Sequence, residues 1–157
     1  PRGKRARRES PTTRAEIRDA GSHVRVAPPG QPKAVGGTIL VAWNGPAQEA
    51  RDLAAAMPLL REAKAITLLN IEEGSGEAPT VEDAVAYLAA HGCVAEAVSQ
   101  SRGRHPVADA LFLAAINQGA DLLVMGAYTH KRIRELIFGG TTLEALLDAT
   151  IPVLMAH

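Results

Sequence analysis

The sequence has very few aromatic side chains and a single cysteine. Aromatic residues make up 3% of the 157 residues, whereas 46% are hydrophobic, so a core must be built from Ala, Val, Leu and Ile. With Cys93 as the one cysteine, no disulfide can form within the chain, which favours a reducing compartment such as the cytoplasm. This length and hydrophobic content are sufficient for one well-buried domain.

Long apolar runs and the usual catalytic motifs are also missing. No run approaches the roughly 18 residues that span a bilayer, and no apolar segment of the signal-peptide kind follows the basic start, so we expect no membrane partner. The five His residues are scattered without a zinc-binding spacing. The sequence has no nucleophile elbow, no Walker A loop and no carboxylate pair with an assignable role. It therefore predicts no catalytic centre and no metal site.

Charge is unevenly distributed although the formal net charge is zero. Residues 1–25 hold 8 Lys and Arg against 3 Asp and Glu, and residues 26–157 hold 9 against 14. The basic start, PRGKRARR, is either an arm for nucleic acid or a membrane surface, or a solvated tail. Because it contains no aromatic side chain on which a base could stack, we expect a tail and no nucleic-acid partner.

Beyond a linker rich in proline and glycine at residues 29–37, apolar runs alternate with amphipathic segments. Strands are predicted at residues 38–43, 65–71, 93–99, 121–126 and 151–156, and helices at about 48–64, 80–91, 106–118 and 141–149. Strands that are near-continuous apolar runs indicate a parallel sheet covered on both faces. The expected fold class is therefore α/β, with a doubly wound five-stranded parallel sheet and helices on both faces.

A few residues mark the ends of the predicted helices. Pro58 falls inside the first helix, where we expect a kink. Thr80 is the expected N-cap of the second helix, with Asp83 three residues further on. Gly92 and Gly119 are expected to end the second and third helices.

The N-terminal region resembles the C-terminal end of the same chain. TTRAEIRDAGSHVRVA (residues 12–27) aligns without a gap with TTLEALLDATIPVLMA (residues 141–156), with six identities in sixteen positions. Both segments predict a short helix followed by a strand. We interpret residues 1–28 as a basic tail and the remnant helix and strand of a preceding repeat, with chance similarity in an alanine-rich sequence as the alternative. Arg25 aligns with Leu154, so the strand at residues 23–27 is less apolar on one face. It is therefore expected at the edge of a sheet.

Doubly wound sheets bind ligands beyond the carboxyl ends of their strands, at the switch point. In this chain we expect the switch point at Asn44 and Gly45, which follow the strand at 38–43, and at the segment from Gly126 onward, which follows the strand at 121–126. GAYTHKRIRELIFGGTT (residues 126–142) has glycines at both ends of a basic stretch. These glycines either bracket a phosphate or form a strand exit and a helix start with nothing bound.

Three segments, ILVAWNG, DLLVMGAYTHKRIRELIFGGTT and IPVLMAH, resemble the universal stress protein family, over about Thr38 to His157. The likeness is greatest to tandem bacterial members, in which a PPG linker joins two halves. The resemblance implies a flavodoxin-like domain over residues 38–157 and a homodimer through the last strand. It also implies a stress-response regulatory module that, in one branch of the family, binds ATP with magnesium. The alternative is a dimerisation or interaction domain that binds no nucleotide. If the protein is an enzyme, we expect at most a slow ATPase.

In the ATP-binding branch, a Gly-x2-Gly-x9-Gly-Ser/Thr motif holds the nucleotide. The resemblance implies a site made of Ala42, Asn44, Ile71, Met125, Gly126, Thr129, Gly139, Gly140 and Thr141. The backbone of Ile71 and Met125 would contact adenine. Thr129 stands where the branch has Gly, and Gly140 stands where it has Ser or Thr. Asn44 replaces the usual Asp, so it can bond a ribose hydroxyl but brings no charge to a metal ion.

Other residues in these segments have two interpretations each. Thr141 and Glu144 match a capping box at the start of a helix. Either this cap alone accounts for the two residues, or the same helix start also binds a phosphate. The basic residues from His130 to Arg134 are either a solvated face or partners for phosphates. Trp43 either packs at the carboxyl edge of the sheet or stacks on a base. The apolar strand 151–156 is expected at an edge, which predicts either the homodimer or capping by residues 23–27.

Overall fold

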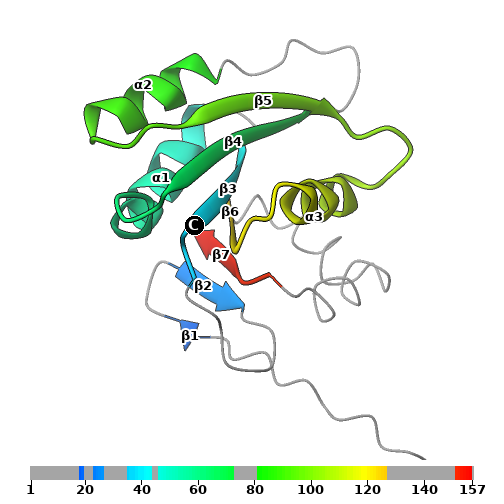
Figure 1. Ribbon diagram of the computed structural model, residues 1–157, viewed down its shortest axis with the longest axis horizontal. Helices are drawn as coiled ribbons and strands as arrows, with labels where there is room; N and C mark the ends of the chain where they lie inside the picture. The colour runs from blue at the N-terminus through cyan, green and yellow to red at the C-terminus, as the bar shows by residue number, and fades with distance from the viewer. Residues whose placement is uncertain are drawn as a thin grey trace, which may run out of the picture.

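A computed structural model describes residues 18–19, 23–26, 35–43, 46–72, 81–126 and 151–156. Seven strands form one sheet in the order β1-β2-β7-β6-β3-β4-β5 (Figure 1). The strands are β1 (Arg18–Asp19), β2 (His23–Val26), β3 (Thr38–Trp43), β4 (Ala65–Glu72), β5 (Glu96–Ser101), β6 (Leu122–Gly126) and β7 (Val153–Ala156). The helices are α1 (Pro46–Leu60), α2 (Glu82–Ala90) and α3 (Val107–Asn117). None of the described helices is both long and apolar enough to cross a membrane.

The predicted five-stranded parallel sheet is confirmed. Strands β7, β6, β3, β4 and β5 pair in parallel, and the antiparallel hairpin of β1 and β2 extends the sheet beyond β7. From β3 the chain proceeds outward to β4 and β5, then returns to β6 and β7 on the other side. The switch point therefore lies between β3 and β6.

Helices cover both faces of the sheet, as predicted (Figure 1). Five of the six residues of β3 are buried, and they alternate between two core clusters. Ile39, Val41 and Trp43 pack with residues of α1 and α2, whereas Leu40 and Ala42 pack with α3. Because side chains of a strand alternate between its faces, a near-continuous apolar run supplies both cores at once.

Both predicted helix-ending glycines are confirmed. Gly92 and Gly119 have φ of +80° and +64°, and each follows a helix whose last carbonyls are satisfied by two backbone bonds. After α2 the N–H of Gly92 donates to Ala89 and that of Cys93 to Leu88, the pattern of a Schellman motif. Cys93 therefore belongs to the end of α2. It is buried, and the prediction that a strand begins at Cys93 is wrong, since β5 starts at Glu96.

Two other predicted boundaries differ from the structure. Helix α1 continues only two residues beyond Pro58 and ends at Leu60, four residues before the predicted end, since proline removes a backbone donor from the last turn. The N-cap position of α2 is Val81 rather than Thr80, and no side chain caps it. The predicted helix at 141–149 lies outside the described residues.

The predicted strand at 23–27 is confirmed as β2, but its expected place at a sheet edge is wrong, because β2 pairs with β7 on one side and with β1 on the other. The helix expected before it is also wrong at Arg18–Asp19. These two residues form β1, with Arg18 opposite Arg25 and Asp19 opposite Val24. A helix of this length is marginal by itself, whereas β2 offers a second edge of backbone donors and acceptors. Gly21 and Ser22, between the strands, are residues that favour turns.

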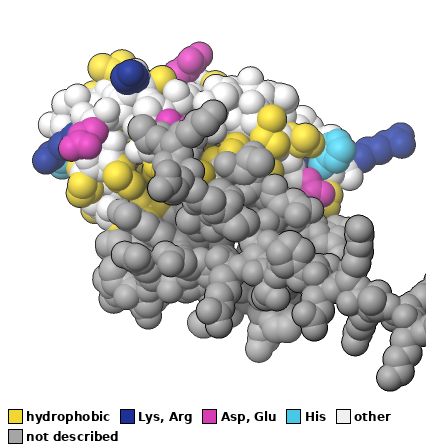
Figure 2. All heavy atoms as spheres, turned by 60° about the horizontal axis from the view of Figure 1, so that its bottom comes forward, with side chains coloured by type: hydrophobic (Ala, Val, Ile, Leu, Met, Phe, Trp, Pro, Cys, Tyr) yellow, Lys and Arg dark blue, Asp and Glu magenta, His cyan; other side chains and the backbone are white. Residues whose placement is uncertain are grey.

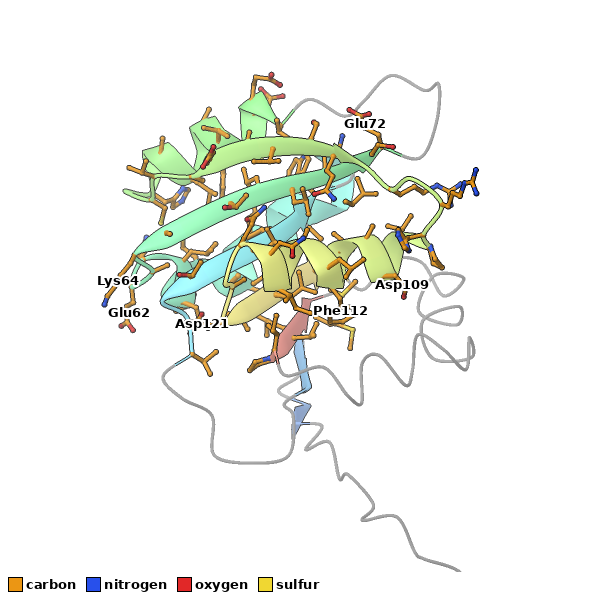
Figure 3. The ribbon with its side chains drawn as sticks, turned by 45° about the vertical axis from the view of Figure 1, so that its right-hand side comes forward. Glu62, Lys64, Glu72, Asp109, Phe112 and Asp121 are labelled. Atoms are coloured by element: carbon orange, nitrogen blue, oxygen red, sulfur yellow. The ribbon has the colours of Figure 1, made fainter. Side chains whose placement is uncertain are left out.

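The carboxylate of Asp121 fixes the start of the sheet. One oxygen, Oδ1, accepts hydrogen bonds from the backbone N–H of Gly36 at 2.9 Å and of Thr38 at 3.1 Å, and Oδ2 accepts one from Gly37 at 2.9 Å. The N–H of Asp121 donates to the carbonyl of Thr38. Figure 3 shows Asp121 at the same end of the sheet as Lys64, with Glu72 and Asp109 at the other end. The residues at the start of β3 and β6 are thereby held in register.

The two glycines at this point have separate structural roles. Gly36 has φ of +101°, a conformation that L side chains rarely adopt. A Cβ on Gly37 would lie 3.0 Å from Oδ2 of Asp121, so any side chain there would push the carboxylate away. The end of the predicted linker is thus part of the folded domain.

We predict that Asp121→Ala lowers the free energy of unfolding by about 2 to 3 kcal/mol, because three partly buried N–H groups lose a charged acceptor. Asp121→Asn keeps one acceptor oxygen and should cost less. Glu62→Ala, an exposed change at the same end of the sheet, should stay within about 0.5 kcal/mol of the parent. Urea denaturation measures all three, and equal values for Asp121→Ala and Glu62→Ala would contradict the role given to Asp121.

Candidate functional site

The carboxyl ends of β3, β6 and β4 bring four of the predicted site residues to one edge. Strands β3 and β6 are neighbours, in register up to the pair of Val41 and Val124. The residues that follow these two are Ala42 on β3 and Met125, then Gly126, on β6. Ile71 stands near the end of the next strand, β4. The predicted site residues Asn44, Thr129, Gly139, Gly140 and Thr141 lie outside the described residues.

Three of these residues share one face of the sheet. Ala42, Ile71 and Met125 belong to the same core cluster, which packs against α3, and they are 7%, 6% and 6% exposed. Their side chains are therefore part of the core. What this edge can offer a ligand is the backbone of the strand ends, together with the small size of Ala42.

Trp43 lies on the opposite face of the sheet. It is 4% exposed and packs in the cluster formed with α1 and α2. This supports the interpretation that Trp43 packs at the carboxyl edge. Stacking on a base that lies against Ala42 is excluded, because neighbouring residues of a strand point to opposite faces.

Asn70 is a residue at this edge that the sequence reasoning missed. It is 2% exposed, the one buried polar side chain among the described residues. In register it lies between Trp43 on β3 and Ser99 on β5. Within the described part of the chain no hydrogen bond to its side-chain amide is present. A single asparagine within the apolar run AITLLNI was the available signal.

An exposed basic loop follows β5 at the same edge. Arg102, Arg104 and His105 are all exposed, and Gly103, with φ of +62°, donates its N–H to Ser101 Oγ. Figure 2 shows a histidine and a long basic side chain projecting from one end of the molecule. The sequence reasoning assigned this segment to a loop and gave it no role, since two arginines in a loop are common on any surface.

Metal ligands do not gather in the described part of the chain. Among those residues no group of three or more His, Cys, Asp and Glu is placed to hold a metal ion. The basic residues from His130 to Arg134, and Asn44 itself, lie outside the described residues. In the described part of this edge, a ligand would therefore meet the backbone of the strand ends, with exposed basic residues nearby.

Comparison with known proteins agrees with this geometry. The family model described as the Universal stress protein family matches residues 37–157. Universal stress protein Slr1230 of Synechocystis sp. (strain ATCC 27184 / PCC 6803 / Kazusa) is 56% identical over 34 residues. That match covers 22% of this chain and 12% of the relative, so most of the relative has no counterpart in the match.

Solved structures share the fold. A universal stress protein from Archaeoglobus fulgidus is similar with a TM-score of 0.56 and 24% identity, over 76% of this chain and 98% of that one. A universal stress protein in complex with cAMP has a TM-score of 0.54 and 18% identity, over 76% and 96% of the two chains. The Archaeoglobus fulgidus protein in complex with dAMP has a TM-score of 0.50 and 23% identity, over 76% and 97%.

We predict that Asn70→Leu raises the free energy of unfolding by about 1 kcal/mol, because it replaces a buried amide by an apolar group of similar size. Asn70→Ala should lower it by about 1 to 2 kcal/mol through the cavity that it leaves. Chemical denaturation compares the two variants. If Asn70→Leu is as destabilising as Asn70→Ala, the amide has a partner that its burial conceals, such as an ordered water molecule.

Proposed function

The chain belongs to the universal stress protein family, and we propose that it is a stress-response regulatory module that binds ATP or another adenine nucleotide. The observation that carries this proposal is the meeting of Ala42, Ile71 and Met125 on one face at the carboxyl edge of the sheet. Nucleotides bind doubly wound sheets at such switch points. Solved family members in complex with cAMP and with dAMP support an adenine ligand.

In this proposal the purine is held mainly by backbone groups. The side chains of Ile71 and Met125 are committed to the core, whereas a strand end offers both an N–H donor and a carbonyl acceptor. Adenine presents a donor and acceptors on its edges, so a short stretch of backbone can pair with it. A larger residue than Ala42 would fill the space over which the ring must lie.

The phosphates would extend from Gly126 toward Gly139, Gly140 and Thr141, where the start of the helix predicted at 141–149 would provide free N–H groups. Thr129 replaces a glycine of the family motif, and a β-branched residue is costly wherever positive φ is required. This departure favours ligands with few phosphates over ATP. Arg102 and Arg104 supply positive charge at the same edge, although exposed Glu72 partly offsets it.

The proposed role is regulatory rather than catalytic. Asn44 carries no charge, so magnesium would enter with the phosphates of ATP rather than on a protein carboxylate. A slow ATPase is the most that this set of residues would support, since no general base has been assigned. We propose a cytoplasmic location, in keeping with the single cysteine.

The alternative is an interaction domain that binds no nucleotide. The pairing of β7 with β2 favours this alternative. It shows that the outer edge of β7 accepts another strand, which is what an interaction domain needs. The homodimer through residues 151–156 remains a prediction under either function.

We predict that millimolar ATP with magnesium, AMP or cAMP raises the thermal midpoint of the full chain. A ligand present at 100 times its dissociation constant stabilises the native state by about 2.7 kcal/mol, which gives a shift of several degrees in a domain of this size. GTP at the same concentration is the matched control and should give a smaller shift.

Two variants locate the binding. Gly139→Val should abolish the shift with ATP, because a side chain would occupy the proposed phosphate position. Gly103→Ala, a glycine change in the loop after β5, should retain it. If no adenine nucleotide shifts the midpoint at concentrations far above physiological, nucleotide binding is refuted and the interaction domain is the function that stands.

A further inference from the structure

Strand β5 forms a free edge of the sheet. The strand order ends at β5, so among the described strands only β4 pairs with it (Figure 1). Its six residues, Glu96–Ser101, follow the register of β4 without a break, and all of them except Val98 are exposed. The backbone N–H and C=O groups along its outer side are therefore open to a further strand.

Several usual protections of such an edge are absent from β5. The strand contains no proline and no lysine, and its continuous register with β4 excludes a β-bulge among these residues. Natural sheets use these devices to block pairing between edges. At the other end of the described sheet lies β1, which has only two residues. Strand β5 is thus the longer edge available to a partner.

Opposite charges stand at the two ends of β5. Glu96 begins the strand and Arg102 follows its last residue, and both side chains are exposed. Within the described part of the chain neither of them has an ion-pair partner. They are separated by an even number of positions, so along an extended strand they face the same side of the sheet. A strand with opposite charges at its two ends complements a copy of itself that runs in the opposite direction.

We propose that β5 is an interface for a second copy of this chain, formed by antiparallel pairing of the two β5 strands. Opposite residues of an antiparallel pair direct their backbone groups the same way, either toward the other strand or away from it. A strand that pairs with its own copy therefore has one residue opposite itself, on a two-fold axis. With Ser99 on this axis, Glu96 of each copy lies opposite Arg102 of the other.

Neighbouring registers match the charges less well. With Val98 on the axis, Glu96 would lie opposite the uncharged Gln100. With Gln100 on the axis, Glu96 would be level with Arg104, which the turn after β5 takes out of the line of the strand. The register centred on Ser99 is the one that places opposite charges directly across the strands, and such pairs stabilise sheets.

The size and geometry of this contact determine how it behaves. Pairing of two six-residue strands buries well below the roughly 1,600 Å² of a standard protein complex, so the dimer is reversible and forms at high protein concentration. Its exposed ion pairs make it weaker as salt is added. Because the two strands run in opposite directions, the carboxyl edges of the two copies point away from each other. The interface therefore leaves the proposed ligand edge open and does not depend on the proposed function.

Charge reversal in the full chain tests the pairing. Glu96→Arg places arginine opposite arginine, and Arg102→Glu places glutamate opposite glutamate. Each variant alone should raise the dimer dissociation constant by about tenfold or more, which is about 1.4 kcal/mol, in sedimentation equilibrium from micromolar to millimolar protein. An equimolar mixture of the two variants should restore the dimer, because every arginine then faces a glutamate. Arg104→Glu is the matched control, since it makes the same change of charge outside the strand and should leave the dimer nearly unchanged.

A single cysteine reports the register. In a Cys93→Ala background, Ser99→Cys brings the two thiols opposite each other at the axis. Ser101→Cys instead offsets them by four residues, about 14 Å along the strands. Mild oxidation should give covalent dimers with Ser99→Cys and monomers with Ser101→Cys. Adding Glu96→Arg to the Ser99→Cys chain should suppress its covalent dimers.

Three results would overturn the proposal. The first is a parent chain that stays monomeric at millimolar concentration. The second is a dimer that neither charge reversal weakens and that Ser99→Cys does not cross-link, since such a dimer uses another surface. The third is a mixture of the two folded charge variants that does not dimerise. If a charge reversal prevents folding, Glu96→Gln and Arg102→Gln remove the ion pairs without repulsion, and unchanged dissociation constants for both would also refute the pairing.

Discussion

The parallel pairing of β3 with β6 is the constraint on which the rest of the structure depends. These strands are separated by most of the domain in sequence, and their pairing brings together the two chain segments that form the switch point. Their register is set at the amino end, where the Asp121 carboxylate binds three consecutive backbone N–H groups before and within β3. A shift of one residue would turn every side chain of a strand to the other face. The alignment of Ala42 with Met125 at the carboxyl end is thus decided at the opposite end of the sheet.

The sequence was informative where one physical signal dominated. Continuous apolar runs predicted the five parallel strands, and Gly92 and Gly119 predicted helix ends because no other residue adopts positive φ so readily. It misled where a residue had a role in tertiary structure. Gly36 and Gly37 read as flexible linker, but their conformation serves a carboxylate 84 residues further along the chain. Cys93 read as strand because apolar residues follow it, yet its N–H closes the end of α2.

The candidate site shows a second limit of sequence reasoning. A site formed by backbone groups leaves little trace in residue type, since Ile71 and Met125 are selected by the core that they fill. The alternation of strand faces could place Ala42 and Trp43 on opposite faces, but only the fold shows which face carries α3. Asn70 illustrates the converse case. Its amide is conspicuous in an apolar strand, yet neither the spacing nor the composition around it indicates that it would be fully buried beside Trp43.

The pairing of β2 with β7 joins two segments that lie near opposite ends of the chain and resemble each other in sequence. Strand β2 is connected to its partner through the same chain, so its effective concentration at the β7 edge is in the millimolar range that short linkers give. The hairpin of β1 and β2 thereby extends the sheet beyond its parallel strands, and the outer backbone groups of β7 are paired within the chain.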